Sequence, residues 1–182
     1  CVNLNIIAPT TTGTTIFIVG GATLNVSGTT TMQANGANKL VRMIITSGTV
    51  NILGDLNFTG SSSDTRWIDM AGGNGTINLS GNCNAGTPSD LISSINSNFN
   101  YIGAGNQTMG GFNYANISLT GSGTKTLVGD AIINGNFLIQ GSATFALGGN
   151  DLSYGASSTL EYNGTSTQTT GPELTSVDAP AN

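Results

Sequence analysis

The chain has 182 residues, enough for one domain with a real core, and its 37% hydrophobic content argues against disorder. Only 7% of the residues are charged, and a net charge of −5 with four scattered cations gives no basic patch for nucleic acid or anionic lipid. Histidine is absent, which removes the commonest general base and metal ligand, and no run reaches the roughly 18 apolar residues of a membrane helix.

Short strands are predicted along the whole chain, because one motif recurs: apolar, any, apolar, any, glycine. In chain order it reads Leu24-x-Val26-x-Gly28, Leu56-x-Phe58-x-Gly60, Ile77-x-Leu79-x-Gly81, Phe99-x-Tyr101-x-Gly103, Ile117-x-Leu119-x-Gly121 and Phe137-x-Ile139-x-Gly141. The alternation buries one face of a strand, and the glycine allows a corner after it. The chain is therefore expected to turn sharply after each short strand.

The spacing of these glycines predicts the fold class. After a longer first interval, from Gly28 to Gly60, they recur at a nearly constant spacing up to Gly141. A period of about 20 residues is typical of a solenoid in which each coil is one repeat. We expect an all-β, single-stranded β-helix of about seven to nine such rungs, with a bulge or inserted loop between Thr29 and Asn38 to explain the first interval. The expected interior residues are Val26, Ile52, Phe58, Leu79, Leu119, Ile139 and Leu147.

One segment favours a helix of one or two turns. "SDLISSINS", from Ser89 to Ser97, follows a proline and carries Leu91, Ile92 and Ile95 at helical spacing. A β-sandwich is the alternative architecture for the whole chain, but it gives no reason for glycine corners at a constant period.

A longer repeat overlies the short one. "FNYIGAGNQT" from residue 99 resembles "LEYNGTSTQT" from residue 160, which separates Tyr101 from Tyr162 by three predicted rungs. We expect rungs over residues 1–164 and a terminal rung, cap or inter-subunit segment over 165–182. Since the pattern stops within a repeat, we expect the chain to continue or to stack on another subunit.

The strongest candidate site is "SSSDTRWIDM", in which Asp64 and Asp69 flank Arg66 and Trp67. In a β-helix lyase an acidic cluster holds calcium while an arginine or lysine removes a proton. The competing interpretation is a strand with exposed charges and an inward Trp67 or Ile68, and the sequence favours it because too few convergent groups are near. We expect no catalysis, no metal and no cofactor, and keep these four residues as a candidate binding surface.

The two cysteines leave three alternatives. Cys1 and Cys83 form a disulfide in an oxidising compartment, both thiols stay unpaired, or Cys1 carries a lipid. The unpaired thiols are favoured, because nothing in the spacing connects the two residues.

Threonine clusters at residues 10–15 and 29–31 suggest a hydroxyl and methyl array of the kind found on ice-binding β-helices. Such an array needs threonine at one rung position along a face, and these clusters do not recur from one predicted rung to the next.

One stretch, "YANISLTGSGTKTLVGDAIINGNFLIQGSATFALGGNDLSYG", resembles the repetitive β-solenoid regions of large secreted surface proteins of Bacteroidota, among them adhesin-like filaments exported by the type IX secretion system. The likeness covers residues 101–182 best and the first hundred residues weakly. It implies display outside the cell, attachment and no cofactor.

The expected function is a structural or adhesive segment of an extracellular, cell-surface filament. The expected partners are other copies or flanking repeats end to end, and surface glycans, with no nucleic acid and no membrane insertion. A carbohydrate-binding or carbohydrate-cleaving β-helix is the alternative, and ice binding is the third.

Overall fold

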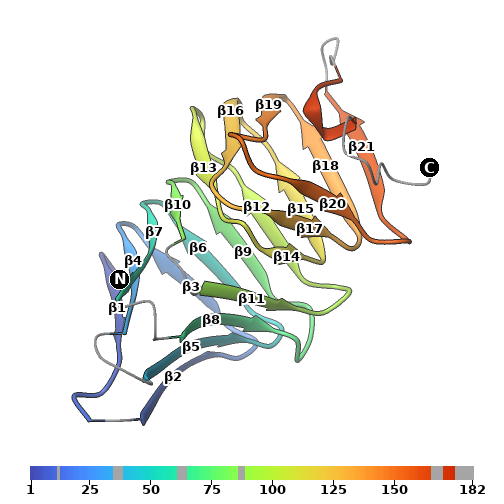
Figure 1. The fold of residues 1–182 in the computed structure, drawn as a ribbon. Coiled ribbons are helices and arrows are strands. Elements are labelled where there is room, and N and C mark those ends of the chain that lie inside the picture. Colours follow the sequence, from blue (N-terminus) through green and yellow to red (C-terminus); the bar gives the residue numbers. More distant parts are fainter. Residues whose placement is uncertain (12, 35–38, 61–64, 86–88, 165–169, 175–182) are drawn as a thin grey trace.

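The protein is a β-solenoid, shown by a computed structural model that describes residues 1–11, 13–34, 39–60, 65–85, 89–164 and 170–174. The chain coils from one end of the molecule to the other and contributes one short strand to each of three faces per turn (Figure 1). Every strand pairing is parallel. The solenoid predicted from the sequence is confirmed.

The three faces are defined by their strands. Face 1 consists of β1 (Leu4–Ile7), β4 (Thr30–Ala34), β7 (Leu56–Gly60) and β10 (Cys83–Asn84), continued by β13 (Gln107–Met109), β16 (Ser122–Leu127) and β19 (Ser142–Ala146). Face 2 consists of β2 (Gly13–Val19), β5 (Lys39–Ile45), β8 (Thr65–Met70) and β11 (Ser89–Ser93), continued by β14 (Asn113–Tyr114), β17 (Ala131–Ile133) and β20 (Leu152–Tyr154). Face 3 is one continuous sheet of β3 (Thr23–Val26), β6 (Thr49–Ile52), β9 (Thr76–Leu79), β12 (Asn98–Tyr101), β15 (Asn116–Leu119), β18 (Asn136–Gln140) and β21 (Thr159–Asn163).

The register on face 3 shows that the turns differ in length. The first turns are the long ones, since Thr23 pairs with Thr49 and Thr49 with Thr76. The turn that pairs Asn98 with Asn116 is much shorter. The solenoid has about six turns, with rungs of about 23 residues. The rungs are therefore somewhat longer and less regular than the glycine spacing predicts.

Columns of apolar side chains run down the interior, because residues in register on successive strands share one face of the pleat. One such column, read down face 3, is Val26, Ile52, Leu79, Tyr101, Leu119, Ile139 and Tyr162. Its first six members are at most 2% exposed. Tyr101 and Tyr162 lie three turns apart, as the longer sequence repeat predicts. Phe58 is buried on face 1, and Leu147 packs against the core.

A column of glycines forms the corner between faces 3 and 1, and here one prediction is wrong. The member that follows Gly28 is Gly54, not Gly60. A Cβ on Gly54 would lie 2.6 Å from the carbonyl carbon of Gly28, and one on Gly81 would lie 2.4 Å from that of Gly54. Gly60 ends strand β7 on face 1. The interval from Gly28 to Gly60 is long because Gly60 does not belong to this corner column, so no inserted loop is needed to explain it. Between Thr29 and Asn38, Thr30–Ala34 form strand β4, and residues 35–38 lie outside the described residues.

The helix predicted at Ser89–Ser97 is also wrong. Ser89–Ser93 form strand β11, which pairs in register with β8. Leu91 is buried, whereas Ile95 is 82% exposed, so the two do not share a buried helical face. Pairing to the preceding rung outweighs a weak local preference. No helix among the described residues is long and apolar enough to cross a membrane.

A short 3-10 turn, η1 (Pro172–Leu174), packs against β19 beside the last rung. The buried carboxylate of Glu173 accepts hydrogen bonds from the Tyr162 hydroxyl and the Gly171 amide, and its backbone carbonyl accepts one from the Tyr154 hydroxyl at 2.9 Å. These contacts fasten residues 170–174 to the solenoid. Residues 165–169 and 175–182 lie outside the described part of the chain.

Candidate functional site

The predicted surface cluster on β8 is divided between the inside and the outside of the solenoid. Arg66 shares the inward direction of Ile68, and it is 1% exposed. Trp67 is half-buried on the outer surface of face 2. Asp64 lies outside the described residues. The competing interpretation, an inward Trp67 or Ile68, is confirmed by Ile68, whereas its exposed charges are wrong for Arg66 and Asp69, which are buried.

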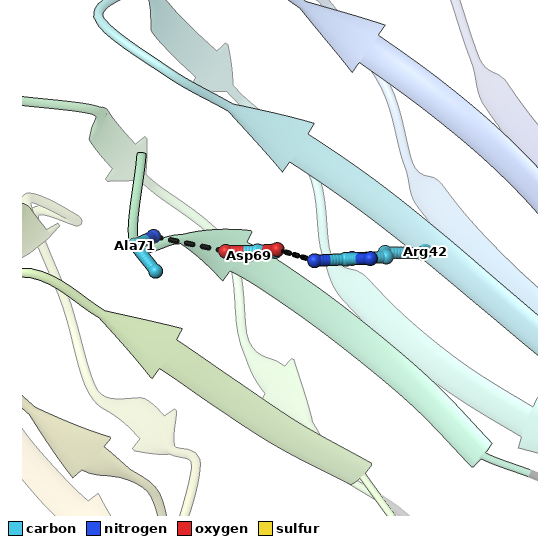
Figure 2. A network of polar contacts seen from close by, with 3 residues as sticks. All are labelled: Arg42, Asp69 and Ala71. Atoms are coloured by element: carbon cyan, nitrogen blue, oxygen red, sulfur yellow. Dashed lines mark hydrogen bonds and ion pairs between the residues drawn. The ribbon is translucent and has the colours of Figure 1, made fainter. Parts of the chain in front are cut away.

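Asp69 is held in a polar network that crosses two rungs (Figure 2). Its Oδ2 accepts an ion-paired hydrogen bond from Nη2 of Arg42 on the preceding rung, and its Oδ1 accepts one from the Ala71 backbone amide at 2.9 Å. The Asp69 side chain is 7% exposed and that of Arg42 is 32% exposed. Both carboxylate oxygens are therefore engaged by the protein, and the network fixes the end of β8 to β5.

Exposed isoleucines lie beside this network on the outer surface of face 2. Ile16 and Ile18 on β2 are 51% and 65% exposed. The register continues from Ile16 to Arg42 and Trp67, and from Ile18 to Ile44 and Asp69. Trp67 thus lies beside the Arg42 side chain on a largely apolar strip across the first rungs.

Face 3 carries a different surface, a ladder of asparagine side chains. The Nδ2 of Asn51 donates to the Oδ1 of Asn25 at 2.7 Å, and Asn78 donates to Asn51 at the same distance. Asn100 donates to Asn78 at 2.8 Å, and the Ser118 hydroxyl donates to Asn100 at 2.7 Å. Each inner member of the ladder receives one hydrogen bond and gives another, so the ladder connects five rungs side by side. Stacked amide ladders of this kind add to the stability of parallel sheets.

The sequence contained the signal for this ladder. In the first five strands of face 3, the residue between the two apolar positions is the ladder residue: Leu-Asn-Val, Val-Asn-Ile, Ile-Asn-Leu, Phe-Asn-Tyr and Ile-Ser-Leu. The prediction used the apolar positions and ignored the polar residue that lies between them.

Beside the ladder runs a second outward column on face 3, which begins with three threonines. Thr23, Thr49 and Thr76 are in register on neighbouring strands, followed by Asn98 and Asn116. The threonine clusters noted in the sequence do not form this column. Thr30, from the second cluster, is fully buried.

A groove of about 790 Å³ crosses the outer side of face 3 over the last four rungs. Its lining is mainly amides and hydroxyls, many of them from β12, β15 and β18, with the carboxylate of Glu161 on β21 and the apolar side chains of Ile95, Ile117 and Leu138. Among the residues that the structure describes, arginine, lysine and aromatic side chains do not line the groove. The groove can offer many neutral hydrogen-bonding groups and little charge.

The two cysteines lie on rungs that are far apart along the solenoid. Both thiols are free; Cys1 is exposed and Cys83 is buried. Leu4, close to Cys1 in the sequence, shares a register column with Thr30, Leu56 and Cys83. Three strand spacings are roughly 14 Å, which exceeds the limit of about 7 Å for the Cα atoms of a disulfide. The disulfide alternative is therefore wrong for this fold.

Two side chains that are often reactive, Lys125 and Cys83, are buried inside the solenoid. Lys125 is fully buried, and its Nζ donates to the carbonyls of Gly103 and Gly105 at 2.8 Å and of Ser122 at 3.0 Å. Burial lowers the pKa of Lys125. Burial raises the pKa of the Cys83 thiol to about 12, so this thiol stays protonated and unreactive at neutral pH. These groups support the corners and the core.

Among the described residues no three His, Cys, Asp or Glu side chains are grouped so as to hold a metal ion. No family model, curated protein or solved structure matches the chain. The β-solenoid architecture is thus the level at which the molecule is classified.

Proposed function

We propose that this solenoid is a structural and adhesive segment of an extracellular surface protein or filament. The observation that carries the proposal is the continuous seven-stranded face 3, whose outer side chains connect rung to rung through the asparagine ladder. Such a surface is long, polar and nearly uncharged, which suits many weak contacts with another surface. The resemblance of residues 101–182 to secreted Bacteroidota surface proteins supports display outside the cell.

The mechanism is mechanical. Each rung hydrogen-bonds along its backbone to the next, and neighbouring rungs bury one another's apolar faces. Within the described residues, β21 at one end of face 3 pairs only with β18, whereas Cys1 and Val2 partly cover the edge of β3 through backbone bonds to Asn25, Ser27 and Gly28. Open strand edges favour further pairing, so the partners proposed are other copies or flanking repeats joined end to end.

The experiment is an attachment assay under flow. Beads that carry the chain are tested on whole cells and on polysaccharide films, and the same polysaccharides are assayed for reducing ends and unsaturated products. We expect shear-resistant attachment and no turnover. Reproducible turnover would instead favour a carbohydrate-cleaving β-helix. Antibodies against the chain are expected to label intact cells of the source organism without permeabilisation.

Ice binding is a second candidate function, supported by the Thr23, Thr49 and Thr76 column rather than by the threonine clusters. Three threonines in register give a short row of hydroxyl and methyl groups, and the same column then continues with asparagine. Thermal hysteresis would establish this function, and we expect none because the row covers only three rungs.

A further inference from the structure

The groove on face 3 contains the last two members of the ladder, Asn100 and Ser118, together with polar side chains that lie outside the ladder. Along the ladder, amide groups are used by neighbouring rungs. In the groove, Asn98 and Asn116 donate to the backbone carbonyls of Asn96 and Ile95, and Asn116 Oδ1 accepts from the Asn136 backbone amide. These bonds fix the first two groove amides in position.

Asn100, Ser118 and Asn134 of the groove are likewise bonded within the protein, whereas three other polar side chains are available to a ligand. Within the described part of the chain, the side chains of Asn136, Gln140 and Glu161 make no hydrogen bond to the protein, and Asn136 and Glu161 are exposed. An amide both donates and accepts. The groove therefore presents donors and acceptors together on consecutive strands, about 4.8 Å apart.

The ladder ends within the groove, at Ser118. The register column passes from Asn100 and Ser118 to Leu138, and then to Glu161. Leu138 is a half-buried apolar patch between polar neighbours. An apolar patch framed by amides matches a sugar ring, which has an apolar face and hydroxyls around its rim.

We propose that this groove is a binding site for a neutral polysaccharide chain that lies along the solenoid axis, across β12, β15, β18 and β21. The inference rests on the adhesive function proposed above and gives it a location and a ligand class. Polyanionic glycans are disfavoured, because the described lining of the groove contains a carboxylate and no lysine or arginine, in a protein of net charge −5.

The test is an NMR titration of the whole chain, followed in ¹H–¹⁵N spectra that show both backbone and side-chain amides. The probes are cellohexaose, laminarihexaose and maltohexaose, with an oligogalacturonide as the charged comparison. We expect at least one neutral probe to give saturable shifts confined to the groove, and the oligogalacturonide to give none. Asn136→Ala and Glu161→Ala are each expected to weaken binding about fivefold, the loss of one hydrogen bond.

The matched control is Thr144→Ala, which removes an exposed polar group from the outer surface of face 1 and should leave the affinity unchanged. Thermal melts of all variants show whether the fold is retained. Absence of shifts with all three neutral probes up to their solubility limits would overturn the proposal, as would shifts centred on another face or equal weakening by Thr144→Ala. Bead attachment without groove binding would leave the adhesive role standing and refute only this site.

Discussion

Replacing Gly54 by alanine tests the close stacking of the rungs at the corner column. The added Cβ would lie 2.6 Å from the carbonyl carbon and 2.7 Å from the oxygen of Gly28, and 2.9 Å from the backbone nitrogen of Thr29. All three atoms belong to the backbone of the preceding rung, so no side-chain rotation relieves the contact. Overpacking typically costs about 1–3 kcal/mol, and we expect about 3 kcal/mol here.

That loss corresponds to a fall in melting temperature of about 6–12 °C for a chain of this size. The matched control is Gly20→Ala, since a Cβ at Gly20 meets nothing within 4 Å. It should leave the free energy of unfolding unchanged or raise it by up to about 1 kcal/mol. The measurements are calorimetry and urea unfolding. An unchanged slope of the unfolding free energy against urea concentration would show that only stability has changed. Equal stability of the two variants would refute the stacked corner.

Three further changes test the interior and the ladder. Lys125→Met removes the donor to three corner carbonyls, and we expect it to lower the free energy of unfolding in urea by about 2–4 kcal/mol. The control Lys39→Met removes an exposed lysine and should lower it by less than about 1 kcal/mol. The unfolded Cys83 thiol loses its proton above pH 9.0 while the folded thiol keeps it to about 12, so folded protein binds more protons and stability falls as pH rises through this window. The wild type should lose about 1.4 kcal/mol per pH unit there relative to Cys83→Ala, and a thiol reagent should label Cys1 at once but Cys83 only on unfolding; a pH-independent difference would contradict the burial. Asn78→Ala breaks the ladder at its centre and should cost about 1 kcal/mol by thermal melting, whereas an unchanged melt would mean that the ladder adds no stability.

The fold could be predicted from the sequence because its signals are local and repeated. Alternation marks each strand, and the glycine two positions after it marks a corner. Gly60 was misassigned because Leu56-x-Phe58 on face 1 shows the same alternation as the motifs on face 3. Only the pairing of β7 with β4 and β10 shows which face a strand belongs to, and pairing is not encoded in a single motif.

The site was predicted less well, for a related reason. Arg66 was expected on the surface because isolated charges are costly to bury, although its alternation with Ile68 pointed inward. The partner of Asp69 is Arg42, which is distant in the sequence but only one rung away in the fold. The ladder and the groove are likewise formed by residues from different rungs. They can be predicted only when the number of residues in each turn is known, because that number decides which residues lie side by side.

Electron spin resonance distances along face 3 test the stacked solenoid most directly. In a chain with both native cysteines replaced, nitroxides are placed at Asn25 and, in turn, at Ser118, Leu138 or Glu161, which share the ladder column. Four, five and six strand spacings predict separations of about 19, about 24 and about 29 Å, an even rise per turn whatever the length of chain between them. Distances that fail to rise in this order, or that are equal for Ser118 and Glu161, would contradict the solenoid and the surface functions derived from it.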